Sequence, residues 1–459
     1  MSTYHRYHID THPAPHEAPH PNRFIVRVGK VGLAKLLLRE IIHQRGNMAV
    51  VTSRPCMYGV FSGPIGGFAP RPEHCVGCLR CTMEHPEFVR VEPNPARLEL
   101  GDSYLSPDQV DTLLYEAATG RVPVKGAGYR GSFGGRGWDS MWTDMSEIVR
   151  PTRDGIHGRE FISTAVDIGW KPRWLTVEPD GTLSGPRSKV IHLPIPMIFD
   201  LPPRSVRSKA YFMALTESAH RMETLAVVPF EWAQRLSIRS REVAPLVEPD
   251  QVPQLQGDYQ LIELDGWNRE AYEALRHRFP EAVIALRHTL GEDLQAPLDA
   301  GISTFHLAAN YHGQTHDGFI LGAVRQIHEG LIRQGIRQHV TLIGSGGIVA
   351  AEHVPKAIIA GLDAVALDIA PVVALQGRMV GECTHPYSAQ IKMPDFNHDW
   401  ACQRLQNLFA SWRDQLLEIM GAMGLREVRR LRGEIGRAMF QAELEHMAFR
   451  DIEGFGGAP

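Results

Sequence analysis

Residues 190–395 alternate short apolar runs with amphipathic segments, and this alternation constrains the fold more than any other feature of the chain. The apolar runs are rich in β-branched residues, and most are followed by a segment with helical periodicity. Such alternation predicts a parallel sheet whose strands are joined by crossover helices. Eight runs fit a compact (β/α)8 TIM-type barrel of the α/β class, with a doubly wound sheet as the alternative. The predicted strands are 195–199, 224–228, 246–248, 260–264, 282–285, 304–308, 340–343 and 364–367, and the predicted helices are 206–221, 268–277, 319–333 and 351–359.

Two segments precede the helical and barrel regions at the N-terminal end. Residues 1–22 are rich in proline, which excludes a helix, and we expect an extended arm that is disordered or lies on a partner. Residues 23–95 begin with a strand-like run at 24–28 and an apolar-periodic helix at 33–42, and then contain a cysteine cluster. They predict a small ferredoxin-like α+β iron–sulfur domain. For residues 1–22, the alternative to a plain extended arm is metal chelation by the histidines of the arm, which are His5, His8, His12, His16 and His20.

Two further segments flank the predicted barrel. Residues 96–189 form a connector in which a helix begins after Ser106, with proline in the first turn and glutamine three residues after the cap. Gly120 is the expected end of that helix. The glycine-rich stretch 123–140 is interpreted as a plain connecting loop, with contact to phosphate or RNA as the alternative. Residues 396–459 read as a helical C-terminal extension.

Composition narrows the class of protein. Lys and Arg number 48 against 52 Asp and Glu, a net charge of −4, which argues against a nucleic-acid binder. No run approaches the ~20 apolar residues of a membrane span. The N-terminus lacks a basic stretch followed by an apolar one, so no signal peptide is expected. Six cysteines in 459 residues do not make a disulfide scaffold, and we expect a cytoplasmic protein.

Three closely spaced cysteines carry the strongest chemical signal. Cys75, Cys78 and Cys81 follow the C-x2-C-x2-C spacing of bacterial ferredoxins, and His85, followed by a proline, stands where the fourth cysteine of that run would be. Cys56 lies upstream within reach, and counting the same run back from it meets no further cysteine, so a second cluster is not expected. The pattern predicts one [4Fe–4S] cluster on these four cysteines, which would transfer single electrons. Structural zinc on the same residues is the alternative.

A glycine-rich loop follows the seventh predicted barrel strand. Its residues are Gly344, Ser345, Gly346, Gly347 and Ile348, and a predicted helix comes after them. Glycines let backbone amides approach a phosphate, and TIM barrels often bind phosphate on the loops after strands seven and eight. The eighth predicted strand is followed by Asp368 and Ile369 at the same expected end of the barrel.

At this point the chain resembles the FMN-binding domain of the glutamate synthase family, in particular its short, archaeal-type members with an N-terminal ferredoxin-like segment. The resemblance lies in residues 145–155, 344–348, 370–375 and 423–428. It implies an FMN-bearing barrel, electron transfer from cluster to flavin, and reductive amination of a 2-oxo acid by an amine or ammonia. It also implies partner subunits of a glutamate synthase-like complex, such as an amidotransferase or an electron donor.

The sequence departs from the family in several places. The family's large subunit begins, once processed, with a catalytic cysteine, whereas this chain begins with Met1 and Ser2, so ammonia is expected from solution or another subunit. Of the family's cysteines after the eighth strand only Cys383 remains, with Gly377 and Ser388 where its partners are expected. The loop after the first strand, residues 199–203, is also altered.

The resemblance implies roles for individual residues at the barrel mouth. The amides of 346–348 would hold the flavin phosphate and Arg287 would stabilise negative charge near the flavin, while His312 or His316 would donate a proton to the reduced imine. The alternative for each histidine is a hydrogen-bonded loop residue. The alternative for Arg287 is an ion pair inside the barrel with a carboxylate, either Glu263 or Asp265.

Asp368 conflicts with the flavin expectation, because it stands where the family has a glycine beside the phosphate. A carboxylate within ~4 Å of a phosphate costs about 1 kcal/mol in water and several at a lower effective dielectric. Asp368 is therefore expected either to turn away or to prevent FMN from binding.

Two hypotheses follow. The first is a glutamate synthase-like iron–sulfur flavoprotein oxidoreductase. The second is a non-catalytic electron-transfer or scaffold subunit with a degenerate flavin site.

Overall fold

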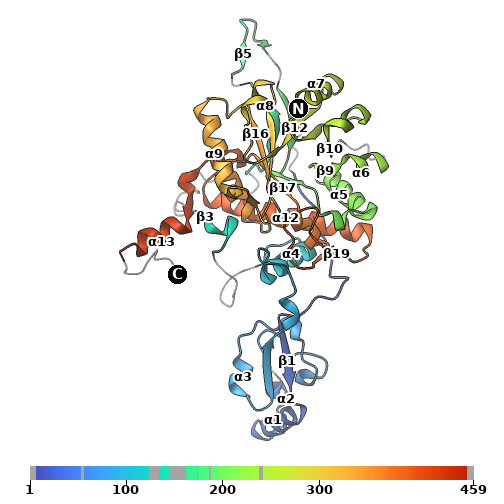
Figure 1. Ribbon diagram of the computed structural model, residues 1–459. Coiled ribbons are helices and arrows are strands. Elements are labelled where there is room, and N and C mark those ends of the chain that lie inside the picture. The colour runs from blue at the N-terminus through green and yellow to red at the C-terminus, as the bar shows by residue number, and fades with distance from the viewer. Residues whose placement is uncertain are drawn as a thin grey trace. The chain divides into compact units, whose positions relative to one another are not determined.

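The computed structural model (Figure 1) describes residues 7–52, 56–123, 134–143, 162–172, 174–185, 188–236 and 241–451. The chain divides into two compact units, which we describe separately. The larger unit consists of Met1–Pro15, Asp102–Pro123 and Ser132–Pro459, and the smaller one of His16–Gly101 and Val124–Gly131.

A closed barrel of eight parallel strands forms the centre of the larger unit. All eight strands predicted from the sequence are present, and they follow one another around the barrel in chain order, so the barrel prediction is confirmed and the doubly wound alternative is wrong. Starting from the first strand, they are β8 (Met197–Phe199), β9 (Ala226–Pro229), β10 (Val243–Val247), β11 (Leu261–Asp265), β12 (Val283–Thr289), β13 (Thr304–Ala308), β16 (Thr341–Ser345) and β17 (Ala364–Leu367).

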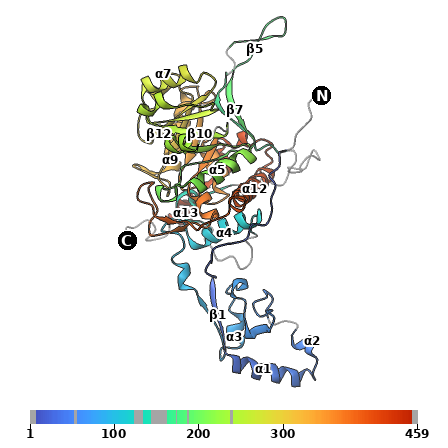
Figure 2. The ribbon, with the colours of Figure 1, turned by 90° about the vertical axis from the view of Figure 1, so that its right-hand side faces the viewer.

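Helices surround the strands, as both views show (Figures 1 and 2). Each longer helix buries one stripe against the barrel; Phe212, Leu215 and Ala219 of the first of them are all fully buried. The helices between and after the strands are α5 (Lys209–Arg221), α6 (Phe230–Arg235), α7 (Arg269–Arg278), α8 (Gln295–Asp299), α9 (Ile320–Arg333), α10 (His353–Ala360) and α11 (Ile369–Ala374).

The C-terminal extension is anchored by α12 (His398–Ala422), which packs against α5 and α4 (Pro107–Thr119). Its Arg404 is fully buried and donates hydrogen bonds to the carbonyl oxygens of Ala14 and Ala374, which ties the N-terminal arm to the helix. A last helix, α13 (Gln441–Phe449), follows the short strand β20 (Ala438–Phe440). Among the described residues, none of the helices combines the length and the apolar character needed to cross a membrane.

The helix α4 begins and ends as its sequence predicts. Ser106 and Gln109 form a capping box, and Gly120 adopts a left-handed conformation at the C-terminal end. After it, β3 (Met141–Thr143) pairs with β20. We call the described residues 102–123 and 134–143 the strap, because several of them contact the loops of the barrel.

A hairpin that the sequence analysis did not predict packs at the start of the barrel strands. Its strands are β4 (Val166–Trp170) and β7 (Lys189–Leu193), and Thr341 at the start of β16 exchanges hydrogen bonds with the backbone of Gly169. The hairpin therefore covers the N-terminal end of the barrel and leaves the opposite end for the site. Smaller pairs are β5 (Thr176–Val177) with β6 (Leu183–Ser184), β14 (Gln314–Thr315) with β15 (Gly318–Phe319), and β18 (Arg378–Met379) with β19 (Ile391–Lys392).

The smaller unit is built on two antiparallel strands, β1 (Phe24–Val28) and β2 (Val89–Pro93). Its core is formed by Val60, Phe61 and Val89, against which three of the cysteines pack. The helices of this unit are α1 (Lys30–His43), α2 (Met48–Val51) and α3 (Arg80–Glu84).

Candidate functional site

A buried polar network fills the inside of the barrel near the C-terminal ends of its strands. Arg287 of β12 donates two hydrogen bonds to the Asp200 carboxylate, at 2.8 and 3.0 Å, and a third to Glu263 of β11 at 3.2 Å. Asp200 follows β8 directly and is 2% exposed, and Glu263 is fully buried. Although burial alone would raise it, Arg287 and His306 hold the pKa of Asp200 below its usual range. Arg287 therefore lies in an ion pair inside the barrel, and one partner is the expected Glu263.

His306 of β13 extends this network across the barrel. Its Nδ1 lies 2.7 Å from Glu263 Oε1 and its Nε2 lies 3.1 Å from Ser345 Oγ. His306 and Glu263 are fully buried and Ser345 is 1% exposed. The network thus joins five strand ends through charge-assisted hydrogen bonds, and it fixes the rotamers of the groups it contains.

Asp368 lies at the next strand end, directly after β17. Its carboxylate accepts a hydrogen bond of 2.6 Å from the backbone N–H of Ile369, the first residue of α11. Asp368 is 2% exposed, and burial, together with the neighbouring Asp200, raises its pKa to about 8. Asp200 is a neighbour because β8 and β17 pair, and its N–H donates to the carbonyl oxygen of Leu367 at 2.9 Å.

The glycine loop after β16 is covered by other parts of the chain. The N–H of Gly347 donates to the carbonyl oxygen of Tyr311 at 3.1 Å. Two strap residues donate to the loop's carbonyl oxygens, Trp138 Nε1 to Gly346 at 3.3 Å and Tyr104 Oη to Gly347 at 2.8 Å. Every residue from Gly344 to Ile348 is buried. Protein groups therefore surround this loop.

Close packing explains the glycines of this loop. Gly346 and Gly347 have φ values of +113° and +69°, which residues with a Cβ rarely adopt. A Cβ at Gly346 would lie 2.6 Å from the carbonyl oxygen of Asn310, and one at Gly347 would lie 2.7 Å from Tyr104 Oη. Close contacts with neighbouring protein atoms thus explain why both positions are occupied by glycine.

These contacts test whether the barrel fits a flavin phosphate. A phosphate at the ends of strands seven and eight needs free amides and a field without negative charge. Here the Asp368 carboxyl already takes the Ile369 amide, Tyr311 takes the Gly347 amide, and Asp200 adds a carboxylate. The residues in this arrangement do not fit a phosphate, and we derive no reaction step through FMN.

The two candidate proton donors, His312 and His316, lie in the loop after β13. Their hydrogen-bond partners there are Asp102 and Asp317 rather than Arg287. His312 Nε2 lies 2.8 Å from Asp102 Oδ2, and its ring stacks on Tyr104 with centroids 5.3 Å apart. His316 is exposed and pairs with Asp317 at 2.8 Å, which raises the pKa of His316. Both are hydrogen-bonded loop residues in this structure.

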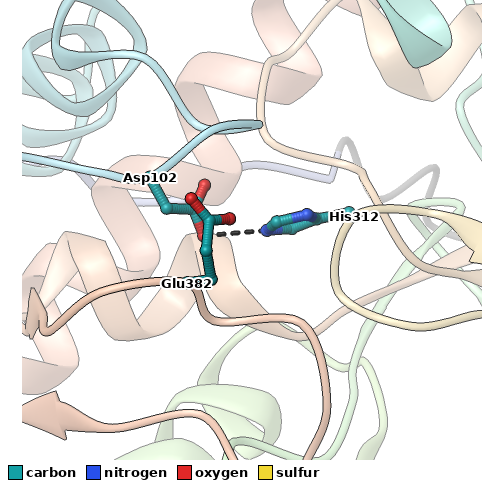
Figure 3. Close-up of side chains that lie close together, drawn as sticks. All are labelled: Asp102, His312 and Glu382. Carbon is teal, nitrogen blue, oxygen red and sulfur yellow. Dashed lines mark hydrogen bonds and ion pairs between the residues drawn. The ribbon is translucent and has the colours of Figure 1, made fainter.

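Figure 3 shows His312 pointing at the carboxylates of Asp102 and Glu382, whose ligand atoms lie within 4.8 Å of one another. Backbone N–H groups of Tyr104, Leu105 and Cys383 also donate to Asp102, at 2.9, 2.9 and 3.2 Å. Ser103 bonds Glu382 through both its N–H and its hydroxyl. With these partners the group joins the strap to two barrel loops.

A second anchor of the strap is Asp139, which the sequence analysis did not single out. Its carboxylate lies 2.9 Å from His353 Nε2 and 3.4 Å from Lys356 Nζ. Burial opposes ionisation, but His353 and Lys356 together hold the pKa of Asp139 well below its usual range. Its partners lie more than 200 positions away in the sequence.

The four predicted cluster cysteines come together in the smaller unit. Cys56, Cys75, Cys78 and Cys81 line one pocket, whose other walls include Val26, Val60, Phe61 and Val91. Burial, and then the neighbouring thiols, raise the pKa values of Cys75 and Cys81.

The backbone between these cysteines has an uncommon conformation. Gly77 and Leu79 have φ values of +68° and +61°, and Leu79 is one of few described residues other than glycine in the left-handed region. A Cβ at Gly77 would collide with the ring of Phe24. Alternation of right- and left-handed residues turns successive N–H groups toward one side, which is a common setting of iron–sulfur sites.

Part of the resemblance to the glutamate synthase family falls outside the described residues. Of the segment 145–155 no residue is described, and neither are Gly126, Gly128 and Gly131 of the glycine-rich connector. The segments 344–348, 370–375 and 423–428 lie in the larger unit.

Comparison with known proteins gives a family for part of the chain. Residues 308–426 match the family described as the conserved region in glutamate synthase. A protein of Methanocaldococcus jannaschii named archaeal glutamate synthase [NADPH] is 31% identical over 25% of this chain and 24% of its own length, so the match spans about a quarter of that relative. An archaeal-type glutamate synthase [NADPH] of Dehalococcoides mccartyi is 21% identical over 79% of this chain and 86% of its own.

Among solved structures, a mandelate oxidase variant with a monooxide FMN adduct has 13% identity and a TM-score of 0.42, covering 73% of this chain and 93% of its own. The barrel itself is established by its strand order. The chain is therefore similar to the archaeal-type glutamate synthases, and the match to the conserved region of that family is confined to residues 308–426.

Proposed function

We propose that this protein is an iron–sulfur electron-transfer protein of the glutamate synthase group, with one [4Fe–4S] cluster on Cys56, Cys75, Cys78 and Cys81. One observation carries the proposal: Cys56 joins the closely spaced Cys75, Cys78 and Cys81, at least 19 positions further along the chain, in lining a single pocket of a separate unit. Three of them have the spacing typical of ferredoxins. Thiols in the cluster require a reducing compartment, so a cytoplasmic location is part of the proposal.

The surroundings of the cysteines support a cluster. Apolar side chains wall the pocket, and the backbone N–H of the left-handed residue Gly77 donates to the Cys75 sulfur. Cluster potentials depend on burial and on hydrogen bonds to the sulfurs, so these residues would set the potential of a bound cluster. The cluster supplies one-electron chemistry, and the chain holds it.

The spacing of the sulfurs favours a cluster over a single zinc ion. Zinc holds each sulfur at about 2.3 Å, which puts tetrahedral sulfurs roughly 3.8 Å apart. Among the described residues, the group whose ligand atoms all lie within 4.8 Å of one another is Asp102, His312 and Glu382, and no three of the cysteines meet that limit. A larger inorganic group suits this wider set of thiols.

A second candidate function is reductive amination of a 2-oxo acid by ammonia or an amine, with this chain as one subunit beside an amidotransferase or an electron donor. It is favoured by the match over residues 308–426, which includes the glycine loop and the last barrel strand. In this candidate the partly exposed Arg287 would bind a carboxylate of the substrate, although Asp200 and Glu263 already engage it.

The experiment that tests the cluster is anaerobic purification of the full chain with iron, acid-labile sulfide and zinc quantified. We expect about four irons and four sulfides per chain, and an electron paramagnetic resonance signal after reduction with dithionite. Cys78→Ser should lose most of the iron. The matched control is Cys402→Ser, at a buried cysteine on α12 of the larger unit. One zinc per chain without iron would refute the proposal.

A further inference from the structure

The ends of β16 and β17 are where this barrel would bind a phosphate, since they are its seventh and eighth strands in chain order. Two kinds of backbone donor are available there, the amides of the glycine loop and the first amide after Asp368. Whether these amides are already bonded to other groups of the protein determines what the C-terminal end of the barrel can bind.

The first amide of α11 already has an acceptor. The Asp368 carboxylate lies 2.6 Å from the backbone nitrogen of Ile369 and is buried. Water therefore cannot easily replace the carboxylate as the partner of this amide. Asp at this position is a preferred N-cap residue and satisfies a donor that the short helix leaves open. The position of an external anion is thus filled by a side chain of the protein.

Above about pH 8, the charge of the Asp368 carboxylate adds to this exclusion. Asp200 follows the strand that pairs with β17, and Arg287 neutralises it through two hydrogen bonds. The charged or titratable groups around Asp368 are Asp200, Arg287, Tyr104, Tyr211 and Tyr311. Since the pKa of Asp368 is about 8, its carboxyl excludes a phosphate by occupying the amide below that pH, and by charge as well above it.

The glycine loop is buried beneath other parts of the chain. Trp138 and Tyr104 of the strap bond its carbonyl oxygens, and Tyr311 accepts from its Gly347 amide. Moving the strap away would break these bonds and those of Asp139 to His353 and Lys356.

We propose that the Asp368 carboxyl is a built-in replacement for the phosphate of a cofactor, and that this barrel binds no phosphate-bearing flavin. The inference goes beyond the iron–sulfur function. It concerns a different unit of the chain, and it decides against the flavin-dependent candidate for this polypeptide. The end of the barrel is left to ligands without a phosphate group.

The test compares FMN binding by the wild-type chain and by variants at Asp368, all as cluster-containing protein. Flavin released from the purified protein is quantified, and FMN is then titrated against flavin-free protein by fluorescence quenching and equilibrium dialysis. Asp368→Gly removes the carboxyl and frees the Ile369 amide. Asp368→Asn removes the charge and keeps a group able to cap that amide. Asp265→Asn is the matched control, because it removes a carboxyl from the end of β11.

We expect less than one-tenth of an equivalent of flavin in the wild-type protein and no saturable binding with FMN near 100 μM. Asp368→Gly should bind FMN at least tenfold more tightly than the wild type, with inorganic phosphate competing, and Asp265→Asn should behave as the wild type. Stoichiometric FMN in the wild-type protein would overturn the proposal. So would a folded Asp368→Gly protein that gains no affinity. If that variant does not fold, the same criterion applies to Asp368→Ala, which also lacks the capping carboxyl, whereas Asp368→Asn keeps a cap and should bind FMN no better than the wild type. Iron content reports on the cluster and flavin content on the barrel, so the two proposals fail separately.

Discussion

Acid is expected to destabilise the barrel through His328, a buried histidine on α9. Its side chain is 5% exposed, and its Nδ1 accepts a hydrogen bond of 2.9 Å from Arg337 Nε. Burial, followed by the charges of Arg337 and Arg432, lowers the pKa of His328 from 6.5 to about 4. The folded state therefore resists protonation, whereas the unfolded chain takes up the proton near pH 6.5. This group lowers stability only slightly at pH 7, and most of the loss occurs as the pH drops from 6.5 toward 4.

The size of the effect follows from the two pKa values. With 6.5 in the unfolded chain and about 4 in the folded one, the group lowers the free energy of unfolding by about 0.2 kcal/mol at pH 7 and about 2 kcal/mol at pH 5. The expected loss between these pH values is about 1.8 kcal/mol, a sizeable part of the stability of a typical domain.

The assay is urea unfolding at pH 7, 6 and 5, followed by circular dichroism under anaerobic conditions. His328→Gln keeps an acceptor for Arg337 but cannot be protonated, so its unfolding free energy should fall less than that of the wild type over this range, by about 1.8 kcal/mol. His316→Gln is the control, because His316 is exposed and lies on a loop. Equal slopes for the wild type and His328→Gln would refute the reasoning.

Further predictions concern the strap and the smaller unit. Trp138→Phe should lower the free energy of unfolding by about 1–3 kcal/mol, since the carbonyl of Gly346 loses a buried hydrogen bond; urea unfolding with Trp267→Phe as control measures this. Asp139→Asn should cost a similar amount and weaken binding of the strap to His353, visible as faster hydrogen exchange in residues 134–143, whereas unchanged exchange would contradict the anchor. Removing iron with a chelator under oxidising conditions should make the smaller unit sensitive to limited proteolysis while the barrel stays resistant, and uniform cleavage of both would argue against a structural role for the cluster. Leu79→Gly should leave the iron content unchanged, because glycine adopts the left-handed conformation more easily than leucine.

The barrel could be predicted from the sequence because its strands are buried on both sides. Such strands read as apolar runs, and each is followed by a helix with one apolar stripe, so periodicity alone locates them. The ends of α4 were predicted for a local reason as well, since Ser106, Gln109 and Gly120 act on their own helix. The hairpin of β4 and β7 was missed, although Asp180-Gly181 is a turn motif between the two strands, because the short apolar runs around it were not interpreted as strands.

The contacts of the candidate site could be predicted only in part. The sequence allowed an ion pair of Arg287 with Glu263 but gave no sign of Asp200 as its main partner, which lies 87 positions earlier. Asp102 and His312 are 210 positions apart, and Asp139 and His353 are 214 apart, so only the closed barrel brings them together. The four cysteines were predicted to meet from their spacing, and they line one pocket.

The covered glycine loop has a consequence for reading sequences of this kind. Gly346 and Gly347 are needed here because the backbone of the 309–313 loop and the hydroxyl of Tyr104 approach them too closely for any side chain. A chain can thus lose its cofactor and still keep a glycine loop typical of phosphate binding, because close packing alone selects against every replacement of these glycines. The residue that indicates the loss is Asp368, at the end of the next strand, so the glycine loop and this position have to be interpreted together.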